Sequence, residues 1–397
     1  MTITLLIDLD DTLLETNMDA FIPAYFKAIS KALENKVNPD LMLSALMGGT
    51  RAMMSNLDPA LSLKNVFDSY FFPKLGMDRA ILQTAIDQFY EEKYPELGVL
   101  TKPIPAAINL IDWAFSRGYR VAIATNPLFP LVAVYGRLRW AGLPPEKYPF
   151  ALVTSYENCH FTKETVAYYP EVLAQLGWPD DPVVMIGDDI EREVKPTRSA
   201  GLPVFLVQKA GKESPDIDGV PHGTLESFRG WLEKTDPEKL RVKFQTPDAL
   251  LAALRATPAA LATITDQLEG DVWRRKPAPN EWNLTEIICH LRDLEQEVNI
   301  PRVQRILTED NPFLPAEMTD GWAEQRKYAS QDGHQALAGL ITARKITINM
   351  LVGLGEEWSR PARHSIFGPT TLQEMVGFIA AHDRAHIQQL WKTIQAG

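Results

Sequence analysis

Pairs of acidic side chains directly follow short apolar runs at two places in the chain. Asp8 and Asp10 come after residues 3–7, and Asp188 and Asp189 come after a later run of the same kind. Carboxylates that gather at one place repel one another unless a cation lies between them. Oxygen ligands of this type suit Mg²⁺. The pattern therefore predicts a magnesium site built from these acids.

Two further polar side chains are suited to binding phosphate. Thr125 follows the apolar run 121–124, and Lys163 begins the helical pattern that comes after the next run. A hydroxyl, an ammonium group and backbone N–H groups can together hold an oxyanion. Asp8 could then attack phosphorus, while Asp10 protonates the leaving oxygen and later activates water.

The same residues also allow simpler interpretations. Asp8 and Asp10 can be acids in a solvated turn after a strand. Asn126 is either a turn residue before a proline or a side chain that positions the backbone and helps to bind substrate. Catalysis is the favoured interpretation for Asp8 and Asp10, because Lys163 and the Asp188 pair would otherwise be coincidences.

The elements that would position these residues alternate along the first half of the chain. Apolar runs with the length of buried strands lie at 3–7, 121–124, 151–153, 183–186 and 204–207. Helical patterns separate them, for example at 106–117 and 164–176. This alternation predicts an α/β domain with a Rossmann-like parallel sheet, covered by helices on both faces. In such sheets, ligands bind beyond the carboxyl ends of the strands.

Residues 1–235 resemble the haloacid dehalogenase superfamily of phosphatases. The resemblance rests on four motifs in the expected order: Asp8-Leu9-Asp10-Asp11-Thr12, Thr125, Lys163 and Gly187-Asp188-Asp189. It implies that Asp8 is the nucleophile and Asp10 the general acid and base. It also implies that Thr125 and Lys163 hold phosphate.

The same resemblance implies how Mg²⁺ is bound and which bond is broken. The ligands would be the Asp8 carboxylate, the Asp10 backbone carbonyl and Asp188. An acid at position 10 points to phosphate esters, because the dehalogenase branch typically lacks it. The last motif often continues to an aspartate five residues after Asp188, and here that place holds Glu193. The outer metal ligand is therefore either Glu193 or Asp189.

A segment at about 15–104 separates the first two motifs and is too long for a simple loop. It has helical patterns at 21–32, 40–47 and 78–94, and it resembles the helical cap of the same superfamily. Caps exclude water and select substrate. The sequence Gly48-Gly49-Thr50-Arg51 predicts a break in the second helix. Arg51 either meets an anionic group of the substrate or is a solvated residue near a helix end.

A composition rich in charged residues, proline and glycine marks the boundary between two domains. Residues 209–216 are typical of a loop, and 236–245 of a linker. The predicted domains are 1–235 and 246–397, each with a core of its own. From residue 246 onward the strand pattern disappears. Four helical segments follow instead, at 246–268, 283–307, 334–354 and 371–395, which predict an all-α four-helix bundle.

Three histidines carry the chemistry of this second domain. His382 and His386 share one helix face, and His290 lies on the apolar face of another helix. Three neutral imidazoles can form a metal site with open positions. Three partly buried histidines without a metal are the simpler alternative. The other four histidines are predicted on the surface or in loops: His160, His222, His334 and His364. Cys289 is predicted in the core.

Residues 246–397 closely resemble DinB-like four-helix metalloproteins. The resemblance is carried by the stretch from Lys276 to Asn283 (KPAPNEWN), by His290, and by the stretch that runs from His382 through His386 (HDRAHIQQ). It implies a divalent metal, often zinc or nickel, at the three histidines. Some members of the group are thiol-dependent transferases or isomerases.

Composition narrows the range of functions. The 397-residue chain has a net charge of −11, and neither half has a basic excess, which argues against nucleic acid as a partner. No apolar run reaches the ~20 residues of a membrane helix. Two cysteines cannot build a disulfide framework. We expect a cytoplasmic Mg²⁺-dependent phosphatase that acts on a small phosphorylated metabolite. The alternatives are that the bundle is the main catalyst, or that it is a binding or dimerisation module in a homodimer.

Overall fold

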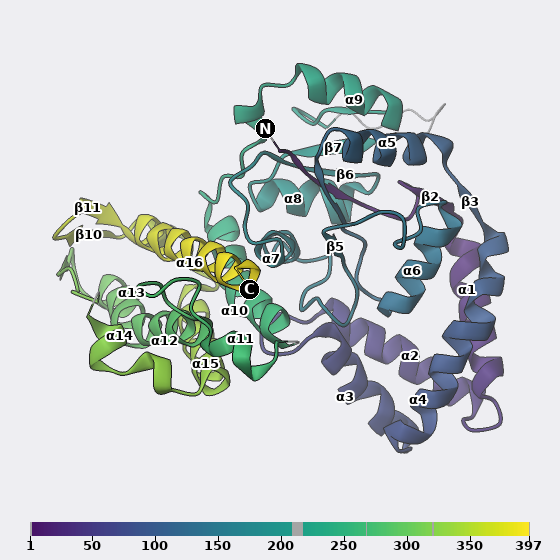
Figure 1. Cartoon of the computed structure of the whole chain (residues 1–397), viewed down its shortest axis with the longest axis horizontal. Helices are drawn as coiled ribbons and strands as arrows, with labels where there is room; N and C mark the ends of the chain where they lie inside the picture. The colour runs from purple at the N-terminus through teal and green to yellow at the C-terminus, as the bar shows by residue number, and fades with distance from the viewer. Residues whose placement is uncertain (1, 209–216, 267, 320, 397) are drawn as a thin grey trace.

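The first domain is built on a six-stranded sheet in which every pairing is parallel. The computed structural model describes residues 2–208, 217–266, 268–319 and 321–396, so the predicted loop at 209–216 lies outside the described residues. In spatial order the strands are β5 (Leu152–Val153), β4 (Arg120–Ile123), β1 (Thr4–Ile7), β6 (Val183–Gly187), β7 (Val204–Val207) and β8 (His222–Gly223). The predicted parallel sheet is confirmed (Figure 1).

Helices bury both faces of this sheet. Leu5 and Ile7 of β1 belong to one core cluster, with side chains of α5 (Pro105–Ser116), α6 (Leu131–Trp140) and α9 (Leu225–Lys234). Leu6, between them in sequence, points to the other face and joins a second cluster. That face is covered by α7 (Tyr168–Gln175) and by Val194 of the short π-helix η3 (Ile190–Val194), which leads into α8 (Lys195–Ser199). The alternation explains why the central strands are apolar at most positions.

The helical cap is confirmed between the first two motifs. A two-stranded antiparallel pair, β2 (Leu14–Thr16) and β3 (Thr101–Pro103), joins it to the core domain. Its helices are α1 (Met18–Leu33), α2 (Pro39–Met54), α3 (Leu63–Leu75) and α4 (Arg79–Gln88), followed by the π-helix η1 (Phe89–Lys93) and the 3₁₀-helix η2 (Tyr94–Leu100). The sequence pattern did not predict α3.

The predicted break at Gly48-Gly49 is wrong, because α2 continues through both glycines to Met54. The reason is the close approach of α3. A Cβ atom at Gly48 would lie 2.2 Å from the Tyr70 ring, and one at Gly49 would lie 2.7 Å from the Phe67 ring. The two glycines therefore make room for a neighbouring helix and do not end their own.

Four long helical segments form the described part of the second domain, as predicted. They are α10 (Pro247–Asp266), α12 (Leu284–Leu294) continued by the π-helix η5 (Glu295–Asn299) and α13 (Ile300–Thr308), then α15 (Gly333–Leu351) and α16 (Leu372–Gln395). Asn283 and Thr371 begin α12 and α16 with capping boxes. Short helices lie at α11 (Gly270–Arg274), α14 (Trp322–Gln325), η6 (Tyr328–Ser330) and η7 (Glu356–Ser359).

The prediction that strands disappear after residue 246 is wrong. A small sheet in the order β11-β10-β9 closes one end of the bundle. It consists of β9 (Phe313–Leu314), β10 (Pro361–His364) and β11 (Gly368–Thr371). These strands are too short to give a periodic pattern, and proline and glycine interrupt them. No helix in the described part of the chain combines the length and the apolar character that a membrane span needs.

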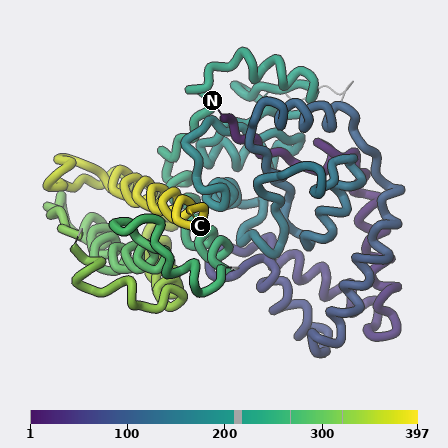
Figure 2. The backbone as a smooth tube through the Cα atoms, viewed as in Figure 1, coloured from purple at the N-terminus to yellow at the C-terminus, as the bar shows by residue number. Residues whose placement is uncertain are grey.

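The two domains share one continuous core, so the prediction of separate cores is wrong. Helix α10 packs on α7, and one cluster of buried side chains runs from Leu6 in the sheet through Leu173 of α7 to Leu254 of α10. Figure 2 shows the bundle lying against this side of the first domain. The side chains of Gln388 and Trp391 on α16 donate hydrogen bonds to carbonyls of the first domain.

The predicted linker is also packed. It contains the 3₁₀-helix η4 (Pro237–Leu240), whose Leu240 is buried in the core of the first domain. The backbone N–H of Lys243 donates to the carbonyl of Gly201 at 2.9 Å. The cap is held as well, because Lys345 on α15 lies 2.7 Å from Asp58 in the α2–α3 loop. The bundle therefore contacts both the core domain and the cap.

A change at this junction should destabilise the whole chain. Trp391→Ala removes an indole that packs against Gly177 and bonds to the Ala174 carbonyl. We expect the free energy of unfolding to fall by roughly 2–4 kcal/mol. Urea denaturation should remain one transition, with α7 and α10 exchanging their amides together. The control Val352→Ala, at an exposed position, should change the free energy of unfolding by less than ~0.5 kcal/mol. Two separate transitions in the wild-type protein would contradict the shared core.

Candidate active site and metal centre

A buried lysine lies between two carboxylates at the carboxyl edge of the sheet. The Nζ of Lys163 is 2.5 Å from Asp8 Oδ1 and 2.7 Å from Glu193 Oε1. The exposed fractions of Asp8, Lys163 and Glu193 are 5%, 1% and 3%. Burial opposes the charge of Lys163, but the two carboxylates outweigh it and raise its pKa well above its usual range. The ammonium group therefore stays charged.

The strand order brings the acids of two distant motifs together. β1 and β6 are neighbours with Ile7 opposite Ile186, so Asp8 and Asp188 follow adjacent strand ends. Ligand oxygens of Asp8, Asp188 and Glu193 all lie within 4.8 Å of one another. Burial, and then the charge of Asp8, raise the pKa of Glu193 well above its usual range. This set of clustered oxygens fits a hard divalent cation such as Mg²⁺.

Of the two candidates for the outer ligand, the structure groups Glu193 with the other acids. The carboxylate of Asp189 caps η3 and accepts hydrogen bonds from the backbone N–H groups of Glu191 and Arg192. Glu193 folds back into the space beside Gly187, where a Cβ atom would lie 1.9 Å from its Oε2. The glycine of the last motif is therefore required by the glutamate that follows it.

The sequence pattern predicted that Lys163 begins a helix, and this prediction is wrong. It lies in a turn, and α7 starts only at Tyr168. Asn126 holds this turn: its Oδ1 accepts from the Lys163 N–H at 3.2 Å, and its Nδ2 donates to Glu164. The backbone-positioning interpretation of Asn126 is therefore favoured. Its predicted contact with substrate stays a prediction.

Thr125 is buried beside this turn, 3% exposed. Its carbonyl accepts hydrogen bonds from the hydroxyls of Thr154 and Tyr168, each at 2.8 Å. These bonds fix the backbone at the end of β4. The phosphate-binding role of Thr125 stays a prediction. The candidate Arg51 is exposed on α2, and it is not among the described residues that line the cavity under the cap.

Asp10 lies apart from the cluster and faces the junction with the cap. Its Oδ2 is 3.0 Å from Nη1 of Arg137, and its Oδ1 accepts from the Thr16 hydroxyl at 3.0 Å. Burial raises the pKa of Asp10, against the opposing charge of Arg137. Sequence reasoning missed Arg137. Its signal is an arginine within the apolar segment 131–140, whose other basic residue is Arg139.

The three predicted histidines of the bundle converge. The Nε2 atom of His382 is 3.4 Å from that of His290 and 3.1 Å from that of His386. Burial lowers the pKa of all three, to about 3 for His290 and about 4 for His386. The rings are therefore neutral at pH 7. Gln389 Oε1 lies 2.8 Å from Nδ1 of His386, and a proton on Nδ1 leaves the Nε2 lone pair free.

Three neutral nitrogens that face one point fit a divalent metal, because their lone pairs repel until a cation joins them. Trp282 lies parallel to the His386 ring, with centroids 6.0 Å apart. This tryptophan belongs to the KPAPNEWN stretch, which therefore forms a wall of the site.

A buried ion network braces the helices around these histidines. The guanidinium of Arg344 on α15 bonds to Glu295 at 2.9 Å and to Asp383, which follows His382 on α16. All three charged groups are essentially unexposed. The pairing fixes the register of three helices. The sequence pattern gave no signal for it, because charged residues are usually solvated.

The remaining histidines and Cys289 divide between the surface and the core. His222 and His334 are exposed, as predicted. The prediction is wrong for His364, which is buried in β10, whereas His160 lies in a loop, as predicted, and is buried there. His160 donates its backbone N–H to Glu171 of α7, and its ring Nδ1 is 2.8 Å from the same carboxylate. Cys289 is buried, as predicted.

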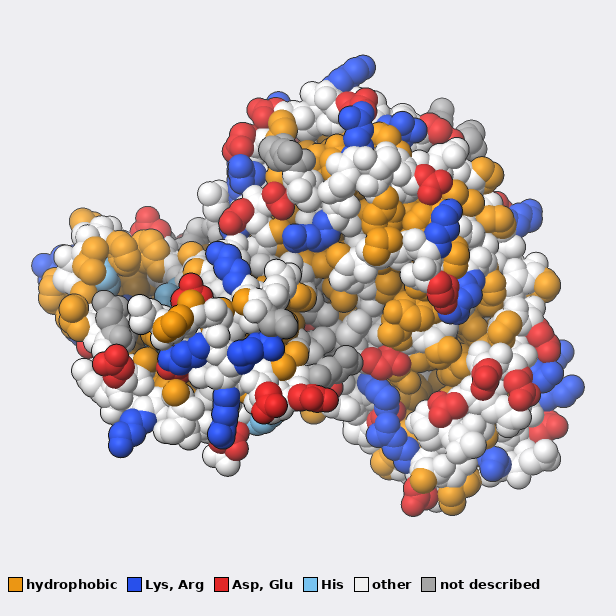
Figure 3. Space-filling view, in the orientation of Figure 1, with side chains coloured by type: hydrophobic (Ala, Val, Ile, Leu, Met, Phe, Trp, Pro, Cys, Tyr) orange, Lys and Arg blue, Asp and Glu red, His pale blue; other side chains and the backbone are white. Residues whose placement is uncertain are grey.

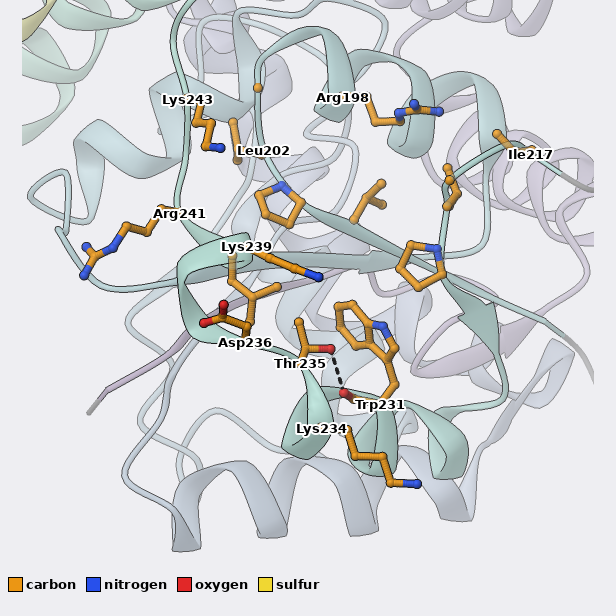
Figure 4. A pocket seen from close by; sticks show the side chains of 17 residues that line it. Arg198, Leu202, Ile217, Trp231, Lys234, Thr235, Asp236, Lys239, Arg241 and Lys243 are labelled. Carbon is orange, nitrogen blue, oxygen red and sulfur yellow. Dashed lines mark hydrogen bonds between the residues drawn. The ribbon is translucent and has the colours of Figure 1, made fainter.

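A cavity of about 890 Å³ lies at the opposite end of the sheet, near the start of β7. Arg198, Lys234 and Arg241 are among its lining residues. Figure 4 shows that their charged ends point away from Trp231 at its centre. Lys239 is the exception, because its amine points toward Trp231 in the same view. We assign this cavity no catalytic role.

Two family models of known proteins match different parts of the chain. Residues 4–201 match the family model of haloacid dehalogenase-like hydrolases, and residues 253–390 match that of the DinB superfamily. The chain therefore combines a haloacid dehalogenase-like hydrolase domain with a DinB-superfamily domain. A curated relative, the uncharacterized protein YuaE of Bacillus subtilis (strain 168), is 23% identical over 135 residues, which are 31% of this chain and 83% of YuaE.

Two solved structures resemble different parts of the chain. The 2-haloacid dehalogenase of Pseudomonas syringae pv. Tomato DC3000 is 20% identical, with a TM-score of 0.43, and the match covers 59% of this chain and 99% of that one. YfiT from Bacillus subtilis, which has a four-helix bundle of unusual topology, is 18% identical with a TM-score of 0.35. That match covers 47% of this chain and 94% of YfiT.

The role of Gly187 can be tested with a single methyl group. Gly187→Ala should push Glu193 out of the cluster, because the new Cβ atom overlaps its carboxylate. We expect Mg²⁺ affinity, measured by titration calorimetry, to fall by roughly 10–100-fold. Gly230→Ala on α9 is the matched control, because nothing lies within 4 Å of its added methyl group. It should leave affinity unchanged. If the Gly187→Ala protein bound Mg²⁺ as tightly as the wild type, Glu193 would not be a ligand of the metal.

The bundle site can be tested by metal content. The full-length protein should bind one equivalent of Zn²⁺ or Ni²⁺, and a hundredfold excess over Kd should stabilise it by ~2.7 kcal/mol. His386→Ala should abolish both effects, because a ligand at the convergence point is lost. His222→Ala, on the surface, should keep both. Elemental analysis that finds no divalent metal after incubation, and no thermal shift, would show that the histidines are structural.

Proposed function

We propose that the protein is a Mg²⁺-dependent phosphatase that hydrolyses a small phosphorylated metabolite through an aspartyl-phosphate on Asp8. The observation that carries this proposal is the buried cluster in which Lys163 is bonded to Asp8 and Glu193, with Asp188 alongside. Such a cluster is costly to bury, so a purely structural role is a poor explanation for it.

Asp8 is the nucleophile in this proposal. Its free carboxylate oxygen attacks phosphorus, and the bond from phosphorus to the ester oxygen breaks. Lys163 orients Asp8 and places a positive charge where the phosphoryl oxygens gather. Asp8, Asp188 and Glu193 would hold Mg²⁺, which when bound neutralises charge on the phosphoryl group. Thr125 would hold a phosphoryl oxygen through its hydroxyl.

Asp10 moves the proton. It protonates the ester oxygen as that oxygen leaves, and then takes a proton from the water that attacks the aspartyl-phosphate. Phosphate is released, and Asp8 is regenerated as a carboxylate. A halide needs no proton when it leaves, whereas an alkoxide does. The acid at position 10 therefore supports phosphate ester hydrolysis over dehalogenation.

Substitutions of Asp8 and Asp10 should reduce phosphatase activity in different ways. Asp8→Asn nearly preserves volume but removes the attacking charge, so phosphate release should fall to background. Asp10→Asn should slow turnover by ~10²–10⁴-fold, with the smallest loss for esters with good leaving groups. Steady-state kinetics on a panel of phosphate esters measures both effects. Near-normal activity of Asp8→Asn, or chloride release from a 2-haloacid without any phosphatase activity, would contradict the proposal.

The bundle supplies a second candidate function. Three histidine Nε2 atoms that converge from two helices leave metal positions open for a thiol or water. We infer that this domain holds a divalent metal, zinc or nickel being the best fits. A thiol-dependent transfer or isomerisation at this centre is the alternative main activity. The remaining alternative is that the bundle is a binding or dimerisation module. If the protein keeps its oligomeric state after the metal is removed, the metal centre is not what holds the subunits together, and the catalytic alternative is favoured.

A further inference from the structure

A cavity of about 190 Å³ lies between the cap and the core domain. Helices of the cap form one side of it, with Tyr25, Leu46 and Phe71 among the lining residues. The loops that follow β4 and β5 form the other side, through Phe129 and Tyr156. Figure 3 shows hydrophobic side chains gathered on the visible face where the cap helices meet the core domain.

The proposed catalytic residues are not among the described lining residues of this cavity, but short chains of contacts connect them to it. Its lining residue Leu128 is three positions after Thr125 in the same loop. Phe129 lies on the guanidinium of Arg137, with 4.7 Å from the ring centroid to Cζ, and Arg137 pairs with Asp10. Asp10, the proposed proton donor, is therefore connected to Phe129 of the cavity wall through Arg137.

The cavity wall offers few polar groups to a ligand. Among the described lining residues, the three that are neither apolar nor tyrosine are Thr50, Asp68 and Gln83. Each already has a partner within the cap. Thr50 donates to the Leu46 carbonyl, Gln83 donates to Asp87, and Asp68 is paired with the cations Lys64 and Arg79.

Two of the three tyrosine hydroxyls of the wall are also engaged with each other. Those of Tyr25 and Tyr90 share a hydrogen bond of 2.8 Å. A ligand hydroxyl placed in this cavity would lose its bonds to water and would meet side chains most of which already have partners. An apolar group would gain contact with the aromatic rings and lose only ordered water. Lysine and arginine are absent from the described lining, and the neighbouring cations Lys64 and Arg79 are already paired with Asp68, so an anionic group has no unpaired counter-charge there.

We propose that this cavity binds the leaving group of the substrate, and that the substrate is therefore a phosphate monoester of a small apolar alcohol, not of a sugar or nucleoside. The inference rests on the proposed phosphatase function and adds the chemistry of the leaving group. A volume near 190 Å³ accepts one six-membered carbocycle and excludes a nucleoside.

The test compares two esters of matched shape. Cyclohexylmethyl phosphate and glucose 6-phosphate both carry a six-membered ring on a primary phosphate ester, and their leaving oxygens have similar basicity. Acetyl phosphate is the third substrate, because its leaving group is too small to need the cavity. We expect kcat/KM of the full-length protein to be at least about a hundredfold higher for the cyclohexylmethyl ester than for the sugar ester.

Two failures can be told apart. Hydrolysis of acetyl phosphate with equal or better use of glucose 6-phosphate would overturn the apolar leaving group while the phosphatase function stands. No phosphate release from any of the three would overturn the phosphatase function and this inference with it.

A pair of substitutions on one helix locates the effect. Leu46→Trp fills the cavity from α2, so the ratio of kcat/KM for cyclohexylmethyl phosphate over acetyl phosphate should fall by about tenfold or more. Leu41→Trp is the control on the same helix, at an exposed position outside the cavity, and should leave the ratio unchanged. An unchanged ratio in the Leu46→Trp protein, with a circular dichroism spectrum and melting temperature like the wild type, would place the leaving group elsewhere.

Discussion

The buried contact of Lys163 with Asp8 and Glu193 is the interaction that the rest of the first domain is arranged to hold. Removing one partner from a buried ion pair typically costs about 3–5 kcal/mol, so all three groups must be brought in together. The parallel order of β1 and β6 supplies two of the acidic positions. Gly187 leaves space for Glu193, and Asn126 holds the turn that carries the lysine.

This requirement ties the hydrolase domain to the bundle. The turn with Lys163 leads directly into α7, whose Glu171 binds the backbone of the loop before it. The other side of α7 is covered by α10 of the bundle, within one continuous core. The bundle also meets the cap through Lys345 and Asp58. The second domain is therefore part of what supports the loop that carries Lys163, in addition to holding its own histidine cluster.

Most of the fold and of the candidate site could be predicted, because strand ends and helix spacing leave local marks in the sequence. Asp8 and Asp188 were identifiable from the runs before them, and His382 and His386 from their spacing. Arg344 left no such mark, and Arg137 left only that of an arginine within an apolar helix, because the roles of both depend on partners from distant elements. The prediction of a helix break at Gly48 and Gly49 was wrong for the same reason, because the close approach of α3 depends on tertiary packing that the local sequence does not show. The shared core was hidden too, because a charged, proline-containing linker looks solvated even where Leu240 is buried.

The central claim is that Asp8 forms a covalent bond to phosphorus, and chemical trapping measures this directly. The protein is mixed with acetyl phosphate and Mg²⁺, quenched in acid during turnover and reduced with borohydride. An aspartyl-phosphate is converted to homoserine by this treatment, and peptide mass spectrometry locates it. The account predicts homoserine at position 8, and unmodified aspartate at positions 10, 11 and 188. Continued phosphate release with homoserine at another position, or with unmodified Asp8 in every quenched sample, would contradict it.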